Sequence, residues 1–373
     1  MISLSSIITR FEAATLAQYR HAILPSQRQA LAAMKQCRTA LAPRMLAQCS
    51  ACDEQRLVPH SCGHRSCPHC QHHESQQWLE RQIRLQVPER YFMLTFTLPA
   101  QLRELAWRHQ RTLYALLFEC AWETVRTFSQ NDRQLQGTPG AVAVLHTHSR
   151  RLDYHPHVHL VMPAAALDGE KRLWRTKVGS AKGGGYLFNH KALAKVFRAK
   201  MLAALCREGL TLPSSCPDKW VVDCKCVGSG EKALVYLGRY LYRGVIAEKD
   251  ILSCESGQVC FRYRDSKTGK MALRTVNGPA FLWLILQHVL PKGFRRARNF
   301  GYLHPNSKRL IALLQVVLKV MPAPASASAS AWMTPRPPLL CKCCGAPMRI
   351  VQRRLRPETR RQCDTGLVAG VNV

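Results

Sequence analysis

A run of histidines at every second position constrains this chain more than any other part of its sequence. Residues 155–159 read His-Pro-His-Val-His, and Leu160 and Val161 follow. Successive side chains of a β-strand point to opposite faces, so the three imidazoles are expected on one face and Val158 and Leu160 on the other. The run therefore predicts a strand with a histidine face. A histidine-rich strand face that is merely solvated is the alternative.

A second strand is expected beside the first. Residues 142–148 form a β-rich run that contains His146 and His148 on a single face, and a six-residue polar turn separates it from the run at 155–162. The two runs are typical of neighbouring antiparallel strands, which would bring a histidine of one run beside those of the other. Neutral imidazoles clustered in this way favour a divalent metal.

A helix is expected over about 229–244. At about 100° per residue its leucines at 234, 237 and 241 form one buried seam. Tyr236 and Tyr240 lie one turn apart on roughly the opposite face. The cations expected on that side are Lys232, Arg239 and Arg243. Core packing is the ordinary explanation of such a tyrosine pair, but the leucines already fill the core face, so we favour a reactive role beside phosphate.

Two cysteine pairs have the spacing of a zinc site. Fourteen residues separate Cys49-x-x-Cys52 from Cys67-x-x-Cys70. Two such knuckles supply four thiolates to a tetrahedral Zn²⁺, which would stabilise a module too small for its own core. We expect these four cysteines to hold one structural zinc. Other residues of the same stretch could replace a ligand, namely His60, Cys62, His64 and His69.

The C-terminal segment contains half of a further site. Cys341-x-x-Cys344 has Cys343 between its members and only Cys363 as a distant partner. Zinc binding there and a floppy basic tail are both compatible with the sequence.

The charge of the chain favours a nucleic-acid partner. Lys and Arg number 54 against 23 Asp and Glu in 373 residues, a formal charge of +31, while 47% hydrophobic residues supply material for a core. The longest apolar runs, at 281–286 and 310–318, are far shorter than the roughly 18 residues that a membrane span needs. Residues 1–10 lack the regions of a secretory signal. We therefore expect a cytoplasmic, nucleoid-associated protein that binds DNA and no membrane.

The order of predicted elements indicates an α+β fold. The expected elements are a strand at 91–98, a helix at 102–128, a break at 137–140, strands at 142–148 and 155–162, a helix at 192–207, a strand at 220–227, a helix at 231–243 and a hairpin at 257–276. The expected parts are a helical segment at 1–45, a zinc-binding module at 46–75, a catalytic domain at 76–320, a linker at 321–338 and a basic, cysteine-containing tail at 339–373.

Several stretches together resemble the insertion-sequence-91 family of rolling-circle transposases, which belong to the HUH (histidine-hydrophobic-histidine) endonucleases. The stretches that carry the resemblance are Cys37-Arg-Thr-Ala, Cys67-Pro-His-Cys-Gln, Phe96-Thr-Leu-Pro, Leu145-His-Thr, His155-Pro-His-Val-His, Tyr236-Leu-Gly-Arg-Tyr and His288-Val-Leu-Pro-Lys-Gly-Phe. They follow the family's order over about residues 25–320. The chain departs from the family at His148, where members often have a bulky aromatic residue, and within 63–66.

The resemblance implies a fold and a chemistry. The fold is an HUH-type antiparallel sheet flanked by helices, preceded by a small helical and zinc-ribbon-like domain. His157 and His159 match the family's metal-binding pair for Mg²⁺ or Mn²⁺, and Tyr236 and Tyr240 match its two-tyrosine motif. For the third metal ligand we expect His146, with His155 next. The implied activity is cleavage and rejoining of single-stranded DNA at element ends and targets through a 5′-phosphotyrosine intermediate.

Two kinds of alternative remain at this stage. A plasmid relaxase or a replication initiator would use the same chemistry, and a non-catalytic zinc-ribbon protein would bind nucleic acid with its histidines and tyrosines as contacts. The residues expected to contact DNA are Lys232, Arg239, Arg243, Lys292, Arg295 and Arg296, with tail arginines over 349–361 adding salt-sensitive affinity. The sequence leaves the oligomeric state open.

Overall fold

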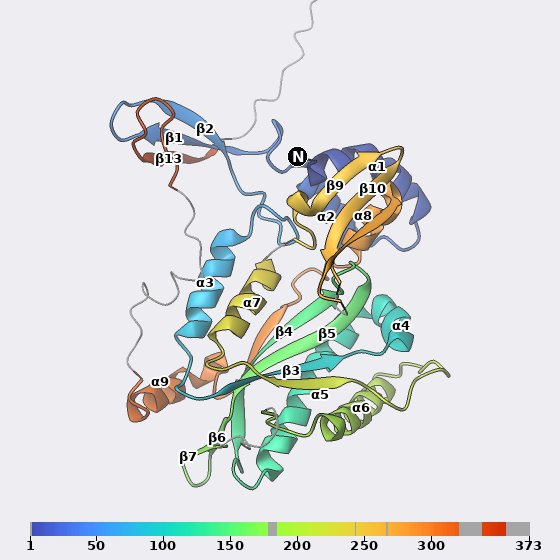
Figure 1. Ribbon diagram of the computed structural model, residues 1–373, viewed down its shortest axis with the longest axis vertical. Helices are drawn as coiled ribbons and strands as arrows, with labels where there is room; N and C mark the ends of the chain where they lie inside the picture. The colour runs from blue at the N-terminus through green and yellow to red at the C-terminus, as the bar shows by residue number, and fades with distance from the viewer. Residues whose placement is uncertain (1, 178–184, 243, 266–267, 321–337, 356–373) are drawn as a thin grey trace, which may run out of the picture. The chain divides into compact units, whose positions relative to one another are not determined.

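A computed structural model of the chain describes residues 2–177, 185–242, 244–265, 268–320 and 338–355 (Figure 1). The chain divides into two compact units, Met1–Lys35 with Gly63–Pro335 and Gln36–Cys62 with Arg336–Val373. In the ranges given above, no helix is both long and apolar enough to cross a membrane. The fold is α+β with a large antiparallel sheet, as the sequence predicts.

A seven-stranded antiparallel sheet is the centre of the larger unit (Figure 1). Its strands are β3 (Tyr91–Thr97), β4 (Thr138–His148), β5 (Tyr154–Pro163), β6 (Ala165–Asp168), β7 (Leu173–Thr176), β8 (Val222–Cys226) and β12 (Ala297–Gly301). The spatial order is β7-β6-β4-β5-β3-β8, and β12 pairs with β4. Strands β4 and β5 are central neighbours, which places both histidine-bearing segments inside the sheet.

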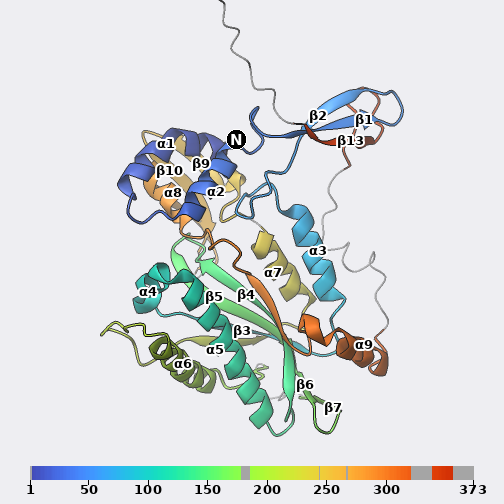
Figure 2. The same cartoon turned by 180° about the vertical axis from the view of Figure 1, so that it is seen from behind.

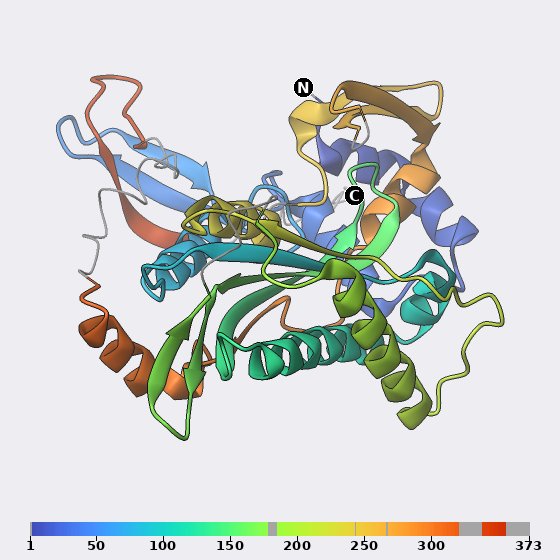
Figure 3. The ribbon, with the colours of Figure 1, turned by 60° about the horizontal axis from the view of Figure 1, so that its bottom comes forward.

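Helices cover both faces of this sheet (Figure 3). The helices of the larger unit around it are α3 (His72–Ile83), η1 (Ala100–Leu102), α4 (Arg103–Arg108), α5 (Gln110–Asn131), α6 (His190–Arg207), α7 (Glu231–Tyr242), η3 (Pro305–Ser307) and α9 (Lys308–Val317). One face presents Phe96, Val158 and Leu160 to a core shared with α5 and α6. The other face presents Val144 and Val161 to α3 and α7. Alternation along β5 thus separates an apolar face from the face that carries the histidines.

A smaller layer within the same unit joins segments that are far apart in the sequence (Figure 2). It contains α1 (Leu4–Gln18), α2 (Pro25–Gln36), η2 (Glu248–Asp250), β9 (Ile251–Glu255), β10 (Gln258–Arg264), β11 (Met271–Asn277) and α8 (Gly278–Leu286). Tyr19 stacks on Trp283 with ring centroids 4.6 Å apart. A Cβ at Gly278 would lie 2.4 Å from the ring of Phe11, so this position has room only for glycine.

The second unit is a three-stranded antiparallel sheet in the order β13-β1-β2. Its strands are β1 (Arg44–Cys49), β2 (Gln55–Pro59) and β13 (Met348–Leu355). The segment described above as a tail therefore contributes a strand that pairs with β1. The buried hydrophobic cluster of this unit is small and consists of Ala47, Cys49, Val58, Cys341 and Met348.

Most predicted elements of the larger unit are confirmed, and two local predictions are wrong. The strands at 91–98, 142–148 and 155–162, the helices at 192–207 and 231–243 and the hairpin at 257–276 are present with shifted ends. The predicted helix at 102–128 is interrupted at His109, whose backbone leaves the helical region. The expected break at 137–140 is instead the start of β4, because Gly140 lets the strand pass within contact of the Tyr302 ring. Residues 321–337 of the expected linker lie outside the described residues.

Candidate functional site

Three histidines meet on one face of the central sheet. In the β4–β5 register, His146 lies opposite His157 and Val144 lies opposite His159. One ligand nitrogen of each histidine lies within 4.8 Å of the others, and all three residues are buried. The structure thus brings together His146, His157 and His159, which we call the histidine group. His155 lies outside it, because its Nδ1 accepts a hydrogen bond of 2.7 Å from the Arg103 guanidinium.

Hydrogen bonds orient the rings of the histidine group. The Nδ1 of His157 donates to the carbonyl oxygen of His155 at 2.7 Å, and the Nδ1 of His159 shares a hydrogen bond of 2.9 Å with the Thr95 hydroxyl. These bonds leave Nε2 of both rings for another ligand. The Nε2 of His146 is buried and has no hydrogen-bond partner among the residues that the structure describes. A buried Nε2 of His146 without a hydrogen-bond partner, next to the Nε2 atoms of His157 and His159, fits a site for a bound cation.

Burial keeps these imidazoles neutral. It lowers the pKa of His159 to about 4. Burial also takes the pKa of His146 and His157 well below the ordinary value, with the neighbouring histidines as further causes. Neutral imidazole is the form that coordinates metals, and three nitrogen donors suit a divalent transition ion. The residues present therefore fit a divalent metal.

The two tyrosines of α7 lie at different depths over this face. The ring of Tyr240 stacks on His146 with centroids 3.2 Å apart and on His148 with centroids 4.7 Å apart. Tyr236 is 50% exposed, and its ring centroid is 5.9 Å from that of His146 and 6.1 Å from that of His159. Tyr240 thus covers the histidine group, whereas Tyr236 borders it and reaches solvent.

Packing on two sides of α7 explains this difference. The predicted leucine seam at 234, 237 and 241 is buried. Gly238, one turn after Leu234, lies beside this seam and against Trp78 of α3, where a Cβ would be 3.3 Å from the indole ring. On the other side of the helix, Tyr240 packs on the His146 and His148 rings of β4. Only a narrow arc remains exposed, and it holds Lys232, Tyr236 and Arg239. Tyr240 therefore lies away from the leucine seam, but the histidine rings cover it instead of solvent.

Two arginines act on the tyrosines electrostatically. Burial raises the pKa of the Tyr236 phenol, and the positive charge of Arg150 opposes this rise. Burial raises the pKa of Tyr240 far more, with Arg296 opposing. Arg296 lies 6.0 Å from the Tyr240 ring centroid and donates to the carbonyl of Leu241 at 3.2 Å, near the end of α7. Sequence reasoning missed Arg150, which follows β4 in the polar turn and carries no motif.

Basic side chains also line a groove on the larger unit. The groove has a volume of about 1140 Å³ and is formed by parts of α3, α5, β12 and α9. Its cations are Arg81, Arg84, Arg111, Arg295, Arg298 and Lys308. Of the residues predicted to contact DNA, Arg295 lines this groove and Lys292, three positions earlier in the chain, is exposed. Arg243 lies outside the described residues. A smaller pocket of about 530 Å³ is lined by Lys232 and Tyr236.

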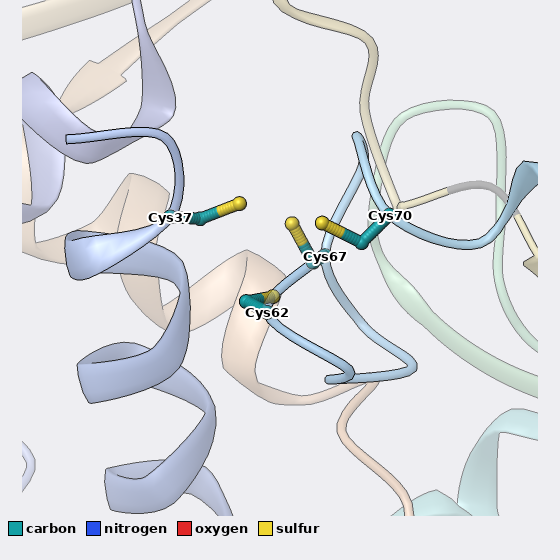
Figure 4. A group of neighbouring side chains, drawn as sticks. All are labelled: Cys37, Cys62, Cys67 and Cys70. Carbon is teal, nitrogen blue, oxygen red and sulfur yellow. The ribbon is translucent and has the colours of Figure 1, made fainter. Parts of the chain in front are cut away.

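The cysteines form two groups instead of the predicted one. The sulfurs of Cys37, Cys62, Cys67 and Cys70 lie within 4.8 Å of one another, and Figure 4 shows them converging. The sulfurs of Cys49, Cys52, Cys341 and Cys344 form the other group within the same limit. The predicted set of Cys49, Cys52, Cys67 and Cys70 is thus divided between two groups.

A strand pairing that the sequence does not reveal causes this division. Pairing of β13 with β1 brings Cys341 to Cys52 across 289 positions of the chain. The histidines considered as substitute ligands make other contacts: His69 lies 3.0 Å from Glu248, and the Nδ1 of His64 accepts from the Ser66 amide. Cys37 and Cys62 complete the first group, and the motif beginning at Cys37 was the signal available for it.

Two segments of the chain match families of known proteins. Residues 7–98 match the family described as "Transposase zinc-binding domain", and residues 140–310 match the family described as "Putative transposase". The chain is 30% identical over 350 residues to "Putative transposase y4qJ" of Sinorhizobium fredii, covering 87% of this chain and 86% of that protein. It is 28% identical over 276 residues to "Transposase for insertion sequence element IS801" of Pseudomonas savastanoi pv. phaseolicola, covering 68% of this chain and 64% of that protein.

Proposed function

The chain belongs to the insertion-sequence-91 family of transposases and carries the family's amino-terminal zinc-binding domain, and from this premise we propose that Tyr236 forms a covalent link to DNA. In this proposal the enzyme cleaves single-stranded DNA through a 5′-phosphotyrosine intermediate and rejoins it, which supports rolling-circle transposition. The observation that most supports this proposal is the position of the Tyr236 ring. The ring is half-exposed, and its centroid lies 5.9 Å from that of the buried His146 ring.

The histidine group supplies the place for the scissile phosphate. His146, His157 and His159 would hold Mg²⁺ or Mn²⁺, which supplies Lewis-acid polarisation of a phosphate oxygen. The hydrogen bonds of His157 to a carbonyl and of His159 to Thr95 hold these rings in a fixed orientation. Because the rings are buried in a sheet, the donors are positioned before DNA binds.

The covalent step exchanges one phosphate ester for another. The Tyr236 oxygen attacks the scissile phosphorus and loses its proton, the bond from phosphorus to the 3′ oxygen breaks, and that oxygen gains a proton. The products are a 5′-phosphotyrosine and a free 3′ hydroxyl, and attack by a 3′ hydroxyl reverses the step and rejoins the DNA. The charge of Arg150 favours the phenolate of Tyr236 at the moment of attack.

Tyr240 has a different role in the first cleavage. Its ring stacks on His146 and its hydroxyl is buried, so DNA cannot reach it in this arrangement. We assign it to positioning His146 during the first step. A second covalent link at Tyr240 requires the ring to leave His146, so the tyrosines act in order, Tyr236 first.

Cations on the larger unit would hold the DNA backbone. Lys232 and Arg239 share the exposed arc of α7 with Tyr236, and the groove at Arg295 and Arg298 offers a basic path. Such contacts supply sequence-independent, salt-sensitive affinity. We propose that single-stranded element ends lie along these surfaces, with Arg296 supporting Tyr240.

The test is formation of a covalent protein–DNA adduct. Purified protein is incubated with Mn²⁺ and a single-stranded oligonucleotide from the end of the element that carries the gene, and products are separated on a denaturing gel. We expect an adduct from the natural chain and from Tyr240→Phe, whose ring can still stack, and none from Tyr236→Phe. An adduct of normal yield from Tyr236→Phe would refute the assignment. A folded natural chain that forms no adduct would refute the chemistry.

A further inference from the structure

Four cysteines of the second unit lie at the distances of a tetrahedral zinc site. The sulfur of Cys344 is 3.5 Å from that of Cys49 and 3.4 Å from that of Cys52, and the Cys52 and Cys341 sulfurs are 3.7 Å apart. Zn–S bonds of about 2.3 Å in a tetrahedron separate the sulfurs by about 3.8 Å. A disulfide needs about 2.05 Å. The spacing therefore fits four thiolates around one ion.

Both halves of this group have the local geometry of a zinc knuckle. The amide of Ala51 donates to the sulfur of Cys49, and the amide of Cys343 donates to the sulfur of Cys341, each at 3.4 Å. Amide donors stabilise a thiolate, the form that binds metal. Each Cys-x-x-Cys pair thus forms the same turn, although one follows β1 and the other precedes β13.

The unit around the group has little else to stabilise it. Its buried hydrophobic cluster has five members, and two of these are the ligands Cys49 and Cys341. Strand β13 presents mostly exposed side chains. A sheet of three short strands with so small a core needs a further constraint, and a metal is a common one in modules of this size.

We propose that Cys49, Cys52, Cys341 and Cys344 bind a second structural Zn²⁺, which joins the segment after β1 to the segment before β13 in one zinc ribbon. The matched zinc-binding domain covers residues 7–98 and so contains only half of these ligands. The other half lies beyond residue 310, where the second matched segment ends. The segment after residue 338 is then a structural part of the amino-terminal module.

Zinc content of the full-length chain tests this site. Protein purified without chelators is analysed by inductively coupled plasma mass spectrometry against amino-acid analysis. We expect two zinc ions per natural chain and one per chain of the double variant Cys341→Ser/Cys344→Ser. The matched control is Cys343→Ser, which removes a neighbouring exposed thiol outside the group and should retain two ions.

A second measurement does not depend on a variant that folds. Pulsed alkylation of the natural chain, read by peptide mass spectrometry, should modify Cys343 at once and the four ligands only after a chelator is added. An equal zinc content of the natural chain and the double variant, or rapid alkylation of Cys341 and Cys344 before chelation, would each refute the site. These readouts measure metal and thiols, so they are independent of the chemistry at Tyr236.

Discussion

The histidine group and the cysteine groups hold their ligands by different means. The histidines project from two central strands of a seven-stranded sheet with cores on both faces. The ligands Cys49 and Cys341 are themselves two of the five residues in the small buried hydrophobic cluster of the second unit. In the first case the fold positions the ligands, and in the second the metal would hold the fold. Loss of metal should therefore abolish chemistry at one site and structure at the other.

The largest expected effect on stability comes from the first cysteine group. Cys67→Ser removes one buried ligand of four, and loss of a structural metal is among the changes that cost about 4 kcal/mol or more. We expect the free energy of unfolding in urea to fall by that order and the zinc content to fall with it. Cys206→Ser, at an exposed cysteine of α6, is the control. If Cys67→Ser loses zinc but keeps the free energy of unfolding of the natural chain, the metal of this cysteine group does not hold the fold, and the proposed difference from the histidine group is wrong.

The next effect is on activity alone. His157→Ala removes a member of the histidine group from a strand that is packed on both faces. We expect adduct yield to fall at least about 100-fold, since metal polarisation is worth several kcal/mol. The zinc content and the unfolding midpoint should stay near those of the natural chain. His155→Ala, outside the group, should lose only a few-fold. Unfolding of His157→Ala would show that this site also holds the fold.

A smaller effect is expected at the partner of His159. Thr95→Val keeps the shape of the side chain and removes the hydroxyl that bonds Nδ1 of His159 at 2.9 Å. Loss of such an orienting bond typically weakens metal binding about 10- to 100-fold. The Mn²⁺ concentration for half-maximal adduct should rise by that factor, with full yield at saturating Mn²⁺. Thr97→Val, on the same strand, is the control. An unchanged half-maximal concentration would mean that the sheet alone orients the ring.

The smallest effect concerns the choice of ion. A group of three imidazole nitrogens suits a transition ion better than Mg²⁺, which prefers oxygen ligands. At equal subsaturating concentrations, Mn²⁺ should give several-fold more adduct than Mg²⁺. Titration of both ions on the same protein measures this ratio. A preference for Mg²⁺ would indicate that oxygen ligands from the DNA dominate the site.

The sequence predicted the histidine group better than the cysteine groups for a physical reason. His146 and His157 belong to consecutive strands, so alternation and a short turn are enough to place them opposite each other. Cys52 and Cys341 meet only because β13 returns to β1, and no local period encodes that pairing. The sequence therefore predicted that cysteines are the ligands and that they occur in Cys-x-x-Cys pairs, but not which pairs share one group.

The tyrosine helix lies between these two extremes. Its leucine seam follows from a period of 3.6 residues and is confirmed. The burial of Tyr240 depends on a second neighbour, β4, whose His146 and His148 rings stack on it. A single helix period describes one buried face, so a helix that is covered on two sides exceeds what such a pattern predicts. Arg150 was missed for a similar reason. It lies in the turn after β4, and its charge opposes the burial-driven rise in the pKa of Tyr236 through space, which no sequence motif indicates.

Identification of the residue that carries DNA tests the central claim most directly. Trypsin cuts after Lys232, Arg239 and Arg243, so Tyr236 and Tyr240 fall in separate peptides, 233–239 and 240–243. The adduct of the natural chain is digested with nuclease and trypsin and analysed by mass spectrometry. We predict that the nucleotide mass is found on peptide 233–239. A nucleotide mass found only on peptide 240–243 would contradict the assignment of Tyr236 as the first nucleophile.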